Sequence, residues 1–290
     1  MTLSIVIPAK NEAATIGTVV SRIVSLHSAA EIVVVDDGST DETAEMARAS
    51  GAEVVSQPYS KGNGAAIKRG ALAATGKTIV FLDGDGQHDP DDIERLLAKV
   101  EEGYDLVVGS RSGLNNQASV ARWTANSFYN RFASWMVGQR IADLTSGFRA
   151  VNRRKFLSFH YLLPNKFSYP TTSTMAFYRA GYSVAFEPIK VARREGKSHI
   201  NLMSDGLRFL LIIFKIGTLY SPLKVYFPFA AVTAGLGFVN YFATVFITDS
   251  WRFTNMSALL ISSGVIIFLL GLLSEQLTNL QYKDVRVDDD

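Results

Sequence analysis

The chain has 290 residues, a formal net charge of +2 and no cysteine, and 48% of its residues are hydrophobic. The nearly balanced charge gives no reason to expect nucleic acid as a partner. The lack of cysteine excludes disulfides, thiolate metal sites and cysteine nucleophiles. The first residues, MTLSIVIPAKNE, have no basic segment before an apolar run and do not predict a signal peptide.

Residues 1–110 alternate between short apolar runs and amphipathic segments. The predicted strands are LSIVIP, EIVVVDD, AEVVSQ, KTIVFLD and DLVVGSR. Between them, the predicted helices are a stretch capped by Asn11 that runs to about Leu26, then STDETAEMARAS, KGNGAAIKRGALAAT and DPDDIERLLAKVEEG. This alternation predicts an α/β domain with a mainly parallel sheet and helices on both faces.

Polar residues follow several of the predicted strands. The strand ends carry Pro8, Asp36, Asp37, Asp83, Asp85 and the segment 109–111. In open parallel sheets, ligands bind in the crevice beyond the carboxyl ends of the strands. We therefore expect the binding site of this domain at that edge.

The stretch VFLDGDGQHDPDD runs from a predicted strand directly into acidic residues. Asp83, Asp85 and Glu94 have the spacing of the first, third and twelfth ligands of an EF-hand loop. However, His88 stands where that loop requires glycine, and a strand precedes it where an EF-hand has a helix. The better interpretation is an Asp-x-Asp pair at a strand tip, with Gln87 close behind. Hard oxygen ligands in such a turn predict Mg²⁺ or Mn²⁺, usually shared with substrate phosphates.

Two further stretches could contact a nucleotide. In VVVDDGSTDET, Asp36 and Asp37 could hydrogen-bond a ribose or a base, or could form a capping turn, which is the interpretation we favour for Asp41. The glycine-rich segment SKGNGAAIKRG, with Lys61 and Gly62, offers backbone amides and a cation for a phosphate. It matches neither a Walker loop nor a dinucleotide fingerprint.

Residues 119–217 mix several signals. A helix is expected from Ser119 to Val137, followed by a turn and strand in DLTSGFRAVNRR, a further helix and the strand YSVAFEPI. The segment NLMSDGLRFLLIIFKIG at 201–217 is too short and too charged to cross a membrane. Its broad apolar surface predicts a helix that lies in the membrane interface. The alternative is an ordinary amphipathic helix packed on the preceding domain.

Two uncharged apolar segments follow, at about 225–247 and 256–274. Each can cross a hydrocarbon core of about 30 Å, and buried core helices are the alternative. The connecting segment, TDSWRFTN, contains aromatic residues suited to the membrane interface. Basic residues lie mainly outside the hairpin, at Lys215, Lys224, Lys283 and Arg286, with Arg252 alone in the loop. This distribution predicts a multi-pass membrane protein whose two ends are cytoplasmic.

Taken in order, the motifs IPAKNE, VVVDDGSTDET, KGNGAAIKRG, FLDGDGQ, VVGSR and DLTSGFRA closely resemble those of glycosyltransferase family 2, which has the GT-A fold. The segment ARREGKSHINL, followed by a membrane-proximal helix and two spans, resembles the polyprenyl-phosphate sugar transferases, relatives of dolichol-phosphate mannose synthase and of bacterial undecaprenyl-phosphate glucosyltransferases. The motifs cover about 1–200, and the architecture covers the rest. We expect a catalytic domain at 1–200, an interfacial helix and linker at 201–223, a hairpin at 224–280 and a cytoplasmic tail at 281–290.

The resemblance implies roles for individual residues. Asp83, Asp85 and Gln87 would hold the metal. The donor-binding set would comprise Pro8, Lys10, Glu12, Asp36, Asp37, Lys61, Gly62, Asp83, Gly84, Arg111 and Arg122. Asp143 would lie near the acceptor, and Asp83, Asp85, Arg111 and Asp143 would form the catalytic set. The acceptor phosphate would meet Arg193, Arg194, Lys197 and Ser198, with His199 in place of the usual lysine.

The expected activity is a metal-dependent inverting transfer of one sugar from a nucleotide diphosphate donor to polyprenyl phosphate. UDP-glucose is the first expected donor and GDP-mannose the second, and the family resemblance makes a homotetramer plausible. The closest rival function is that of a processive polysaccharide synthase. Those enzymes carry a Q-x-x-R-W element, whereas Ser119 stands three residues before Arg122. A transferase acting on a protein or glycan, and an inactive nucleotide-sugar binding protein, are also compatible with these motifs.

Overall fold

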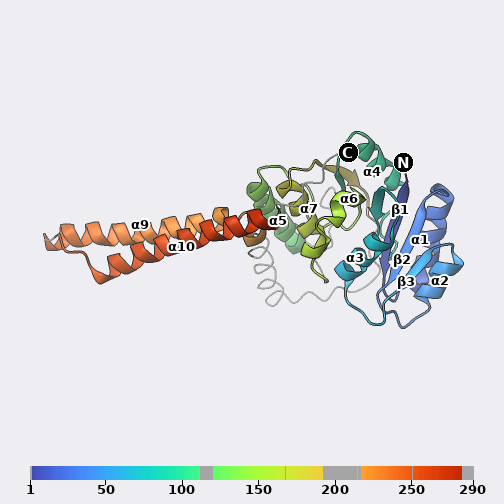
Figure 1. Ribbon diagram of the computed structural model, residues 1–290, viewed down its shortest axis with the longest axis horizontal. Coiled ribbons are helices and arrows are strands. Elements are labelled where there is room, and N and C mark those ends of the chain that lie inside the picture. The colour runs from blue at the N-terminus through green and yellow to red at the C-terminus, as the bar shows by residue number, and fades with distance from the viewer. Residues whose placement is uncertain are drawn as a thin grey trace. The chain divides into compact units, whose positions relative to one another are not determined.

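The computed structural model describes residues 2–111, 120–166, 168–191, 214, 217–249 and 251–282, with side chains of the helix that starts at Val120 described from residue 127. These residues form two compact units, a sheet unit within Met1–His199 and a hairpin unit within Ile200–Asp284 (Figure 1). Each unit is considered by itself.

The sheet unit contains a seven-stranded sheet in the order β3-β2-β1-β4-β6-β5-β7. The strands are β1 Leu3–Ala9, β2 Glu31–Asp36, β3 Glu53–Ser56, β4 Thr78–Phe81, β5 Leu106–Arg111, β6 Arg149–Asn152 and β7 Val184–Ile189. Only β6 is antiparallel to its neighbours in this described sheet, where it pairs with β4 and β5. The sheet is therefore mainly parallel, as the sequence predicts.

Helices cover both faces of this sheet (Figure 1). They are α1 Ala13–Leu26, α2 Thr43–Ala49, α3 Asn63–Ala73, α4 Asp92–Glu101, α5 Val120–Val137, α6 Arg153–Leu157, the 3₁₀ turn His160–Leu162 and α7 Tyr169–Arg179. Ile5 and Ile7 of β1 belong to the core that includes α1 and α4. Val6 points the other way, and a Cβ on Gly70 of α3 would lie only 2.3 Å from its Cγ1. The alternation along β1 thus fixes which helix packs on which face.

The start of α1 differs from the sequence prediction. We expected Asn11 to cap this helix, but the helix begins at Ala13, after Glu12. Asn11 adopts a positive φ of 54°. Its side-chain oxygen accepts a hydrogen bond from the backbone N–H of Thr40 at 2.9 Å. The prediction was wrong because a long-range contact with the loop after β2 engages the side chain that was expected to cap α1.

The register of the strands places the ends of β1 and β2 side by side, and the end of β4 beside the start of β6. Ala9 pairs with Asp36 across β1 and β2. Phe81, at the end of β4, pairs with Arg149, at the start of the antiparallel strand β6. The segment before Arg149 therefore lies at the same sheet edge as the turn after Phe81.

The hairpin unit consists of α9 Pro222–Thr248 and α10 Asn255–Gln281, each 27 residues long. Both are long and apolar enough to cross a membrane, with a mean hydropathy of 1.6 for α9 and 2.4 for α10 over their most apolar windows. Only 11% and 17% of those windows are buried, unlike the core helices of a soluble domain. The two predicted apolar helices are present as candidate membrane spans, and α10 continues seven residues beyond its predicted end, from 274 to 281. The predicted interfacial helix at 201–217 lies almost wholly outside the described residues.

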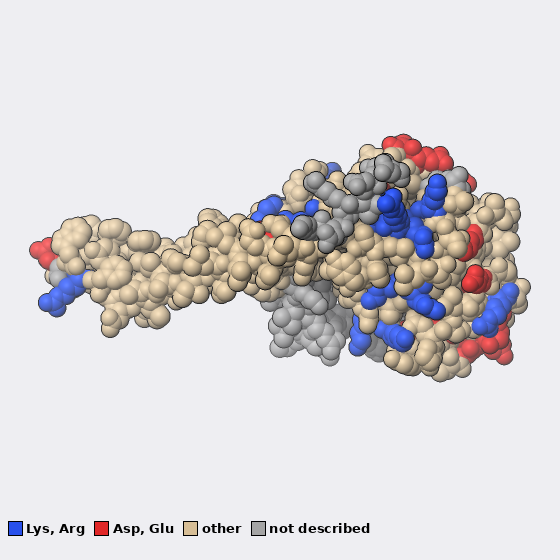
Figure 2. Space-filling view, viewed as in Figure 1, with Lys and Arg blue, Asp and Glu red and all other residues tan. Residues whose placement is uncertain are grey.

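The two long helices pack antiparallel through small residues. A Cβ on Gly237 would lie 2.7 Å from Cγ1 of Ile261, and one on Gly264 would lie 2.8 Å from Cβ of Ala234. Small residues allow membrane helices to approach closely. In the view of Figure 2, the sides of the hairpin are formed by uncharged side chains, and charged ones gather at its tip.

Candidate active site

The turn after β4 holds the two predicted metal-binding carboxylates. Asp83 and Asp85 are both partly exposed there. The Oδ1 atom of Asp85 accepts a hydrogen bond from the backbone N–H of Gln87 at 3.1 Å. Between them Gly86 has a φ of +71°, a conformation that suits glycine. This local turn keeps the carboxylates at the tip of the strand and does not let them extend into the next helix.

Gly84 ties this turn to the start of α1. A Cβ at Gly84 would lie 2.3 Å from Oε2 of Glu12, so only glycine fits without movement. The hydroxyl of Thr15 donates a hydrogen bond to the carbonyl of Gly84 at 2.9 Å. Two residues of the predicted donor-binding set, Glu12 and Gly84, are thus in contact.

The segment before β6 packs against Asp83 from another direction. A Cβ on Gly147 would lie 3.0 Å from Oδ2 of Asp83. The hydroxyl of Tyr169 donates to the carbonyl of Gly147 at 3.2 Å, and Arg149 donates through Nη2 to the carbonyl of Ser146. The backbone beside Asp83 is therefore held by donors from β6 and α7.

Arg149 is a site-supporting residue that the sequence analysis did not identify. Its side chain is fully buried, and burial lowers the pKa of its guanidinium. Nη1 donates to the carbonyl of Pro170 at 3.0 Å and to Oγ of Ser173 at 2.6 Å. Among the residues that the structure describes, no carboxylate forms an ion pair with it. The sequence signal was an arginine at the start of a strand whose next two residues are alanine and valine.

Arg111 and Asp143 form a bidentate ion pair at the end of β5. Nε of Arg111 donates to Oδ2 of Asp143 at 2.7 Å, and Nη2 donates to Oδ1 at 3.0 Å. The side chain of Asp143 is 8% exposed. Burial raises the pKa of Asp143, but the hydrogen bonds and charge of Arg111 outweigh it and leave that pKa below its ordinary value. The structure thus brings together two members of the predicted catalytic set.

Asp37 organises the glycine-rich loop before α3. Its carboxylate accepts hydrogen bonds from Oγ of Ser60 at 2.7 Å and from the backbone N–H groups of Lys61 at 2.7 Å and Gly62 at 2.9 Å. Asp36 accepts from the backbone N–H of Ser39 at 2.9 Å. Both aspartates are engaged in turns, which was one of the two interpretations left open by the sequence. A nucleoside contact at Asp37 stays a prediction.

The other residues predicted to bind the donor differ in their exposure to solvent. Pro8 is buried near the end of β1, whereas Lys10 and Lys61 are exposed. Nζ of Lys61 lies 5.3 Å from the ring centroid of Tyr59. The side chain of Arg122 and all of the predicted acceptor-phosphate residues lie outside the described residues, namely Arg193, Arg194, Lys197 and Ser198, together with His199.

The donor chemistry of the β4 turn fits a hard divalent cation. Asp83 and Asp85 supply carboxylate oxygens, and Gln87 supplies an amide oxygen. Within the described ranges, no three His, Cys, Asp or Glu side chains are grouped to hold a metal ion. A site with two carboxylates leaves coordination positions for phosphate oxygens and water, which is how Mg²⁺ is commonly bound. The residues present therefore fit a cation shared with a nucleotide and do not fit a closed structural site.

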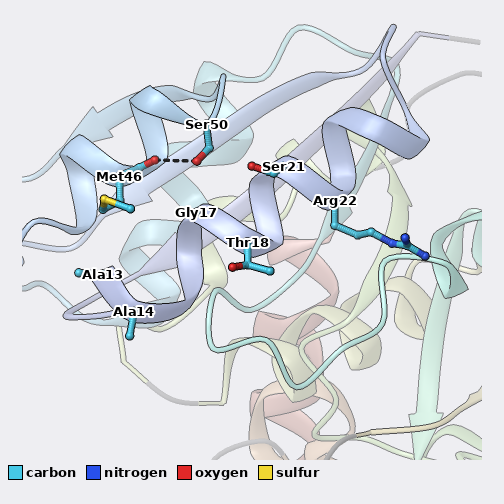
Figure 3. A pocket seen from close by; sticks show the side chains of 8 residues that line it. All are labelled: Ala13, Ala14, Gly17, Thr18, Ser21, Arg22, Met46 and Ser50. Atoms are coloured by element: carbon cyan, nitrogen blue, oxygen red, sulfur yellow. Dashed lines mark hydrogen bonds between the residues drawn. The ribbon is translucent and has the colours of Figure 1, made fainter.

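A separate surface hollow of about 520 Å³ lies on α1 and α2 (Figure 3). It is lined by Ala13, Ala14, Gly17, Thr18, Ser21, Arg22, Met46 and Ser50. Arg22, the one charged residue in this lining, forms an ion pair with Asp91 at 2.8 Å. None of the predicted site residues lines it, so it is not the expected donor site.

Comparison with known proteins identifies the family. The model of glycosyl transferase family 2 matches residues 4–159, and the GtrB C-terminal hairpin model matches residues 221–280. The chain belongs to glycosyl transferase family 2. Its sheet unit has the GT-A fold, and the two candidate membrane helices form a hairpin of the GtrB type, as the sequence resemblance implies.

Two relatives match almost the whole chain. The glycosyltransferase AglJ of Haloferax volcanii is 29% identical over 97% of this chain and 95% of its own length. The undecaprenyl-phosphate 4-deoxy-4-formamido-L-arabinose transferase of Klebsiella pneumoniae is 30% identical over 98% of this chain and 90% of its own. The alignments with both relatives thus extend well beyond the catalytic domain.

The solved structures with similar folds include nucleotide-bound enzymes. The glucosyl-3-phosphoglycerate synthase of Mycobacterium tuberculosis in complex with Mn²⁺ and UDP-glucose aligns with a TM-score of 0.57 and 29% identity, over 74% of this chain and 78% of that one. The same enzyme with Mg²⁺ and UDP aligns with a TM-score of 0.58. A sheet of this kind thus accommodates a nucleotide and a divalent ion in a related enzyme.

Proposed function

We propose that this glycosyltransferase moves a single sugar from a nucleotide diphosphate donor to polyprenyl phosphate, with inversion at the anomeric carbon and with Mg²⁺ or Mn²⁺ as cofactor. The observation that carries the proposal is the union, in one chain, of a family 2 domain bearing the Asp83 and Asp85 turn with a GtrB-type hairpin. A water-soluble acceptor would not require two membrane helices. A lipid-linked acceptor keeps its phosphate at the bilayer surface, and the hairpin would hold the catalytic domain there.

The proposed chemistry places its main electrostatic demand on the leaving group. A divalent ion held by Asp83, Asp85 and Gln87 would supply the charge that stabilises the departing nucleoside diphosphate. The carboxylates themselves bind and orient this charge at the tip of β4. A donor phosphate would supply the remaining oxygen ligands, so metal and nucleotide should bind cooperatively.

The proposed nucleophile needs no general base. A phosphate monoester has a second pKa of about 6, so the acceptor is mostly dianionic at neutral pH. Direct in-line attack by one of its oxygens inverts the anomeric centre. The donor diphosphate and the acceptor phosphate repel each other, so the site needs cations to bring them together. We assign this role to Arg122, Arg193, Arg194 and Lys197, and the hydroxyl of Ser198 would add a hydrogen bond to the acceptor phosphate.

Arg111 would contribute as one half of an ion pair. Its guanidinium is neutralised by Asp143 through two hydrogen bonds. A neutral, rigid pair attracts a phosphate less strongly than a free arginine, but it can orient its remaining donors. We propose that Arg111 and Asp143 shape the site between donor and acceptor.

The donor sugar is the finer part of the proposal. UDP is favoured over GDP because the similar glucosyl-3-phosphoglycerate synthase structures contain UDP or UDP-glucose. UDP-glucose is therefore the first candidate and GDP-mannose the second. The Klebsiella pneumoniae relative acts on 4-deoxy-4-formamido-L-arabinose, which makes a nucleotide-linked aminopentose a third candidate.

The proposed orientation places the sheet unit on the cytoplasmic side of the inner membrane. Lys224 lies near the start of α9, whereas the short loop between the helices contains Arg252. Residues 201–223 would form the interfacial helix and linker, and 281–290 a cytoplasmic tail. A homotetramer is proposed from the family resemblance and would be tested by the mass of the detergent-solubilised protein.

The decisive experiment incubates the purified full chain with undecaprenyl phosphate, Mn²⁺ or Mg²⁺, and each of UDP-glucose, GDP-mannose and UDP-linked 4-deoxy-4-formamido-L-arabinose. Mass spectrometry of the lipid fraction should show a single product, in which one sugar has been added to the lipid phosphate. A ladder of products would support a processive synthase instead. Nucleotide-sugar binding with neither transfer nor hydrolysis would support the inactive binding protein.

A further inference from the structure

His88 occupies an unusual position beside the predicted metal ligands. Its side chain is 7% exposed, and its Nε2 atom lies 3.5 Å from Oδ2 of Asp83. The imidazole ring stacks on Phe148, with ring centroids 5.2 Å apart and an angle of 26° between the planes. Its backbone forms an isolated bridge with Val191. The ring is therefore fixed on one face by an aromatic residue and faces a carboxylate with one nitrogen.

The second ring nitrogen of His88 shows that this placement is costly. Nδ1 is buried and has no hydrogen-bond partner among the residues that the structure describes. An unpaired buried polar atom disfavours folding, because it has given up its hydrogen bonds to water without gaining new ones. An apolar ring would pack on Phe148 without this cost. The nitrogen that does have a polar neighbour is the one that faces Asp83, so the benefit of a histidine here must come from that contact.

We propose that His88 is a positioning residue for the metal site, donating its Nε2–H to Oδ2 of Asp83 and so orienting that carboxylate toward the cation. The inference rests on the proposed metal-dependent function. The Nε2–H is present in one neutral tautomer and in the charged ring. Ligating carboxylates in metal sites are themselves commonly hydrogen-bonded, and this outer contact controls their orientation.

The surroundings of Asp83 explain why orientation matters here. The backbone at Gly147 closes one side of the carboxylate: a Cβ there would lie 3.0 Å from Oδ2 and 3.4 Å from Oδ1. This contact is steric and supplies no hydrogen bond to the carboxylate. A carboxylate flanked only by a steric wall can still rotate about its χ2 torsion, which is broad. A donor at Oδ2 restricts that rotation and leaves Oδ1 for the cation.

The test compares two substitutions of nearly equal shape. His88→Gln keeps an N–H donor at the end of a flexible side chain, whereas His88→Met has similar length and no donor. His27 provides the control, because its side chain is 8% exposed and its Nδ1 lies 3.8 Å from Oε1 of Glu94. It follows the C-terminal end of α1, the end opposite Glu12. His27→Met therefore removes an equally buried imidazole beside a different carboxylate.

The measurement is Mn²⁺ binding to the full chain in detergent with UDP present, read from the electron paramagnetic resonance signal of free Mn²⁺. We expect His88→Met to weaken Mn²⁺ binding by about 10–100-fold, the range typical of lost outer contacts in metal sites. His88→Gln should recover most of this affinity, and His27→Met should leave it unchanged. If His88→Met does not fold, His88→Phe takes its place, because it keeps the stacking on Phe148.

The outcomes separate this inference from the proposed function. Equal Mn²⁺ affinity of the wild type, His88→Met and His88→Gln would overturn the positioning role and leave metal-dependent transfer intact. Equal losses in the Met and Gln variants would also overturn it, since packing and not the N–H would then be responsible. A wild-type protein that binds no Mn²⁺ even with UDP would remove the metal site itself.

Discussion

The sheet unit and the hairpin unit use the same residue types in opposite places. In the sheet unit, valine and isoleucine fill the interior, as at Ile5 and Val34, which are fully buried. In the hairpin unit, large apolar side chains lie outside, as at Val239 and Phe246, and small ones lie between the helices. The first arrangement suits water outside, and the second suits lipid.

Glycine shows the same contrast. In the sheet unit, Gly84 and Gly147 bring backbone close to two carboxylates of the proposed site, those of Glu12 and Asp83. In the hairpin unit, glycine at 237 and 264 brings one helix close to another. Substitutions in the first group should therefore affect chemistry, and those in the second group should affect assembly.

The largest effect is expected at the carboxylate turn. Asp85→Asn keeps the acceptor for the backbone N–H of Gln87 but removes the charge. Since metal stabilisation of developing charge contributes several kcal/mol, transfer should fall by about 1,000-fold or more. The initial rate of lipid-phosphate glycosylation measures this, with the melting temperature of the sheet unit expected to stay near that of the wild type.

Asp89 is the matched control for Asp85. Its Oδ1 also accepts a hydrogen bond from the backbone N–H two residues ahead, at Asp91, with an N···O distance of 3.1 Å, and the residue is exposed. Asp89→Asn should keep nearly full transfer activity. Equal losses in both variants would mean that the overall charge of the loop, and not a site at Asp85, supports catalysis.

The next largest effect is expected between the membrane helices. Gly264→Leu introduces a side chain whose Cβ would lie 2.8 Å from Cβ of Ala234 and 2.9 Å from the carbonyl oxygen of Ala230. Overpacking of this kind costs roughly 1–3 kcal/mol. Gly235→Leu is the control, because a Cβ there meets nothing within 4 Å. We expect only Gly264→Leu to lower the fraction that remains monodisperse after heating in detergent, and a similar loss in both would contradict helix packing at Gly264.

An effect of similar size is expected at the ion pair of Arg111 and Asp143. Asp143→Asn should lower the free energy of unfolding at pH 7 by about 1.5–3 kcal/mol, because hydrogen bonds to a charged group are weakened. The folded-state pKa of Asp143 lies below its ordinary value. Its contribution is therefore complete above the unfolded-state pKa, about 3.9, and is lost as pH falls through the lower folded-state pKa.

Chemical denaturation at several pH values measures this dependence. The difference between the wild type and Asp143→Asn should be constant near neutrality and should shrink below about pH 4. Glu102→Gln, which alters the exposed pair with Lys99, serves as the control and should change little. A difference that grows toward acid pH would have the wrong sign for this ion pair.

The sequence could predict the elements of the fold better than their arrangement. Buried strands such as EIVVVD are recognisable by continuous apolar runs, and the long spans by their lack of charge. The direction of β6 could not be predicted, since the four residues Arg149–Asn152 carry no signal of direction. Pairing between β4 and β6 joins segments far apart in the chain, and only the folded structure determines it.

The site shows the same limit. Asp83 and Asp85 could be proposed as metal ligands from the sequence because their chemistry is local to one turn. His88 and Arg149 were not, because their partners, Phe148 and Ser173, come from other segments of the chain. Arg111 was predicted to be a site residue, but its pairing with Asp143 depends on how the loop after α5 returns to β5. Residue type and local spacing thus suggest which side chains could touch a ligand. Tertiary packing determines which other residues hold those side chains in place.

The smallest effect is expected at Asn240, a polar residue in the mainly apolar helix α9. The side-chain oxygen of Asn240 in α9 accepts hydrogen bonds from Oγ1 of Thr254 at 3.0 Å and from Oγ of Ser257 at 2.9 Å. Such bonds between membrane helices average only about 0.6 kcal/mol. Asn240→Leu should therefore lower the thermal stability of the detergent-solubilised chain slightly. Ser262→Ala should not, because within the described part of the chain its hydroxyl bonds to carbonyls of its own helix, those of Ala258 and Leu259. A loss as large as that of Gly264→Leu would show that polar contacts, and not close packing of small residues, hold the two helices together.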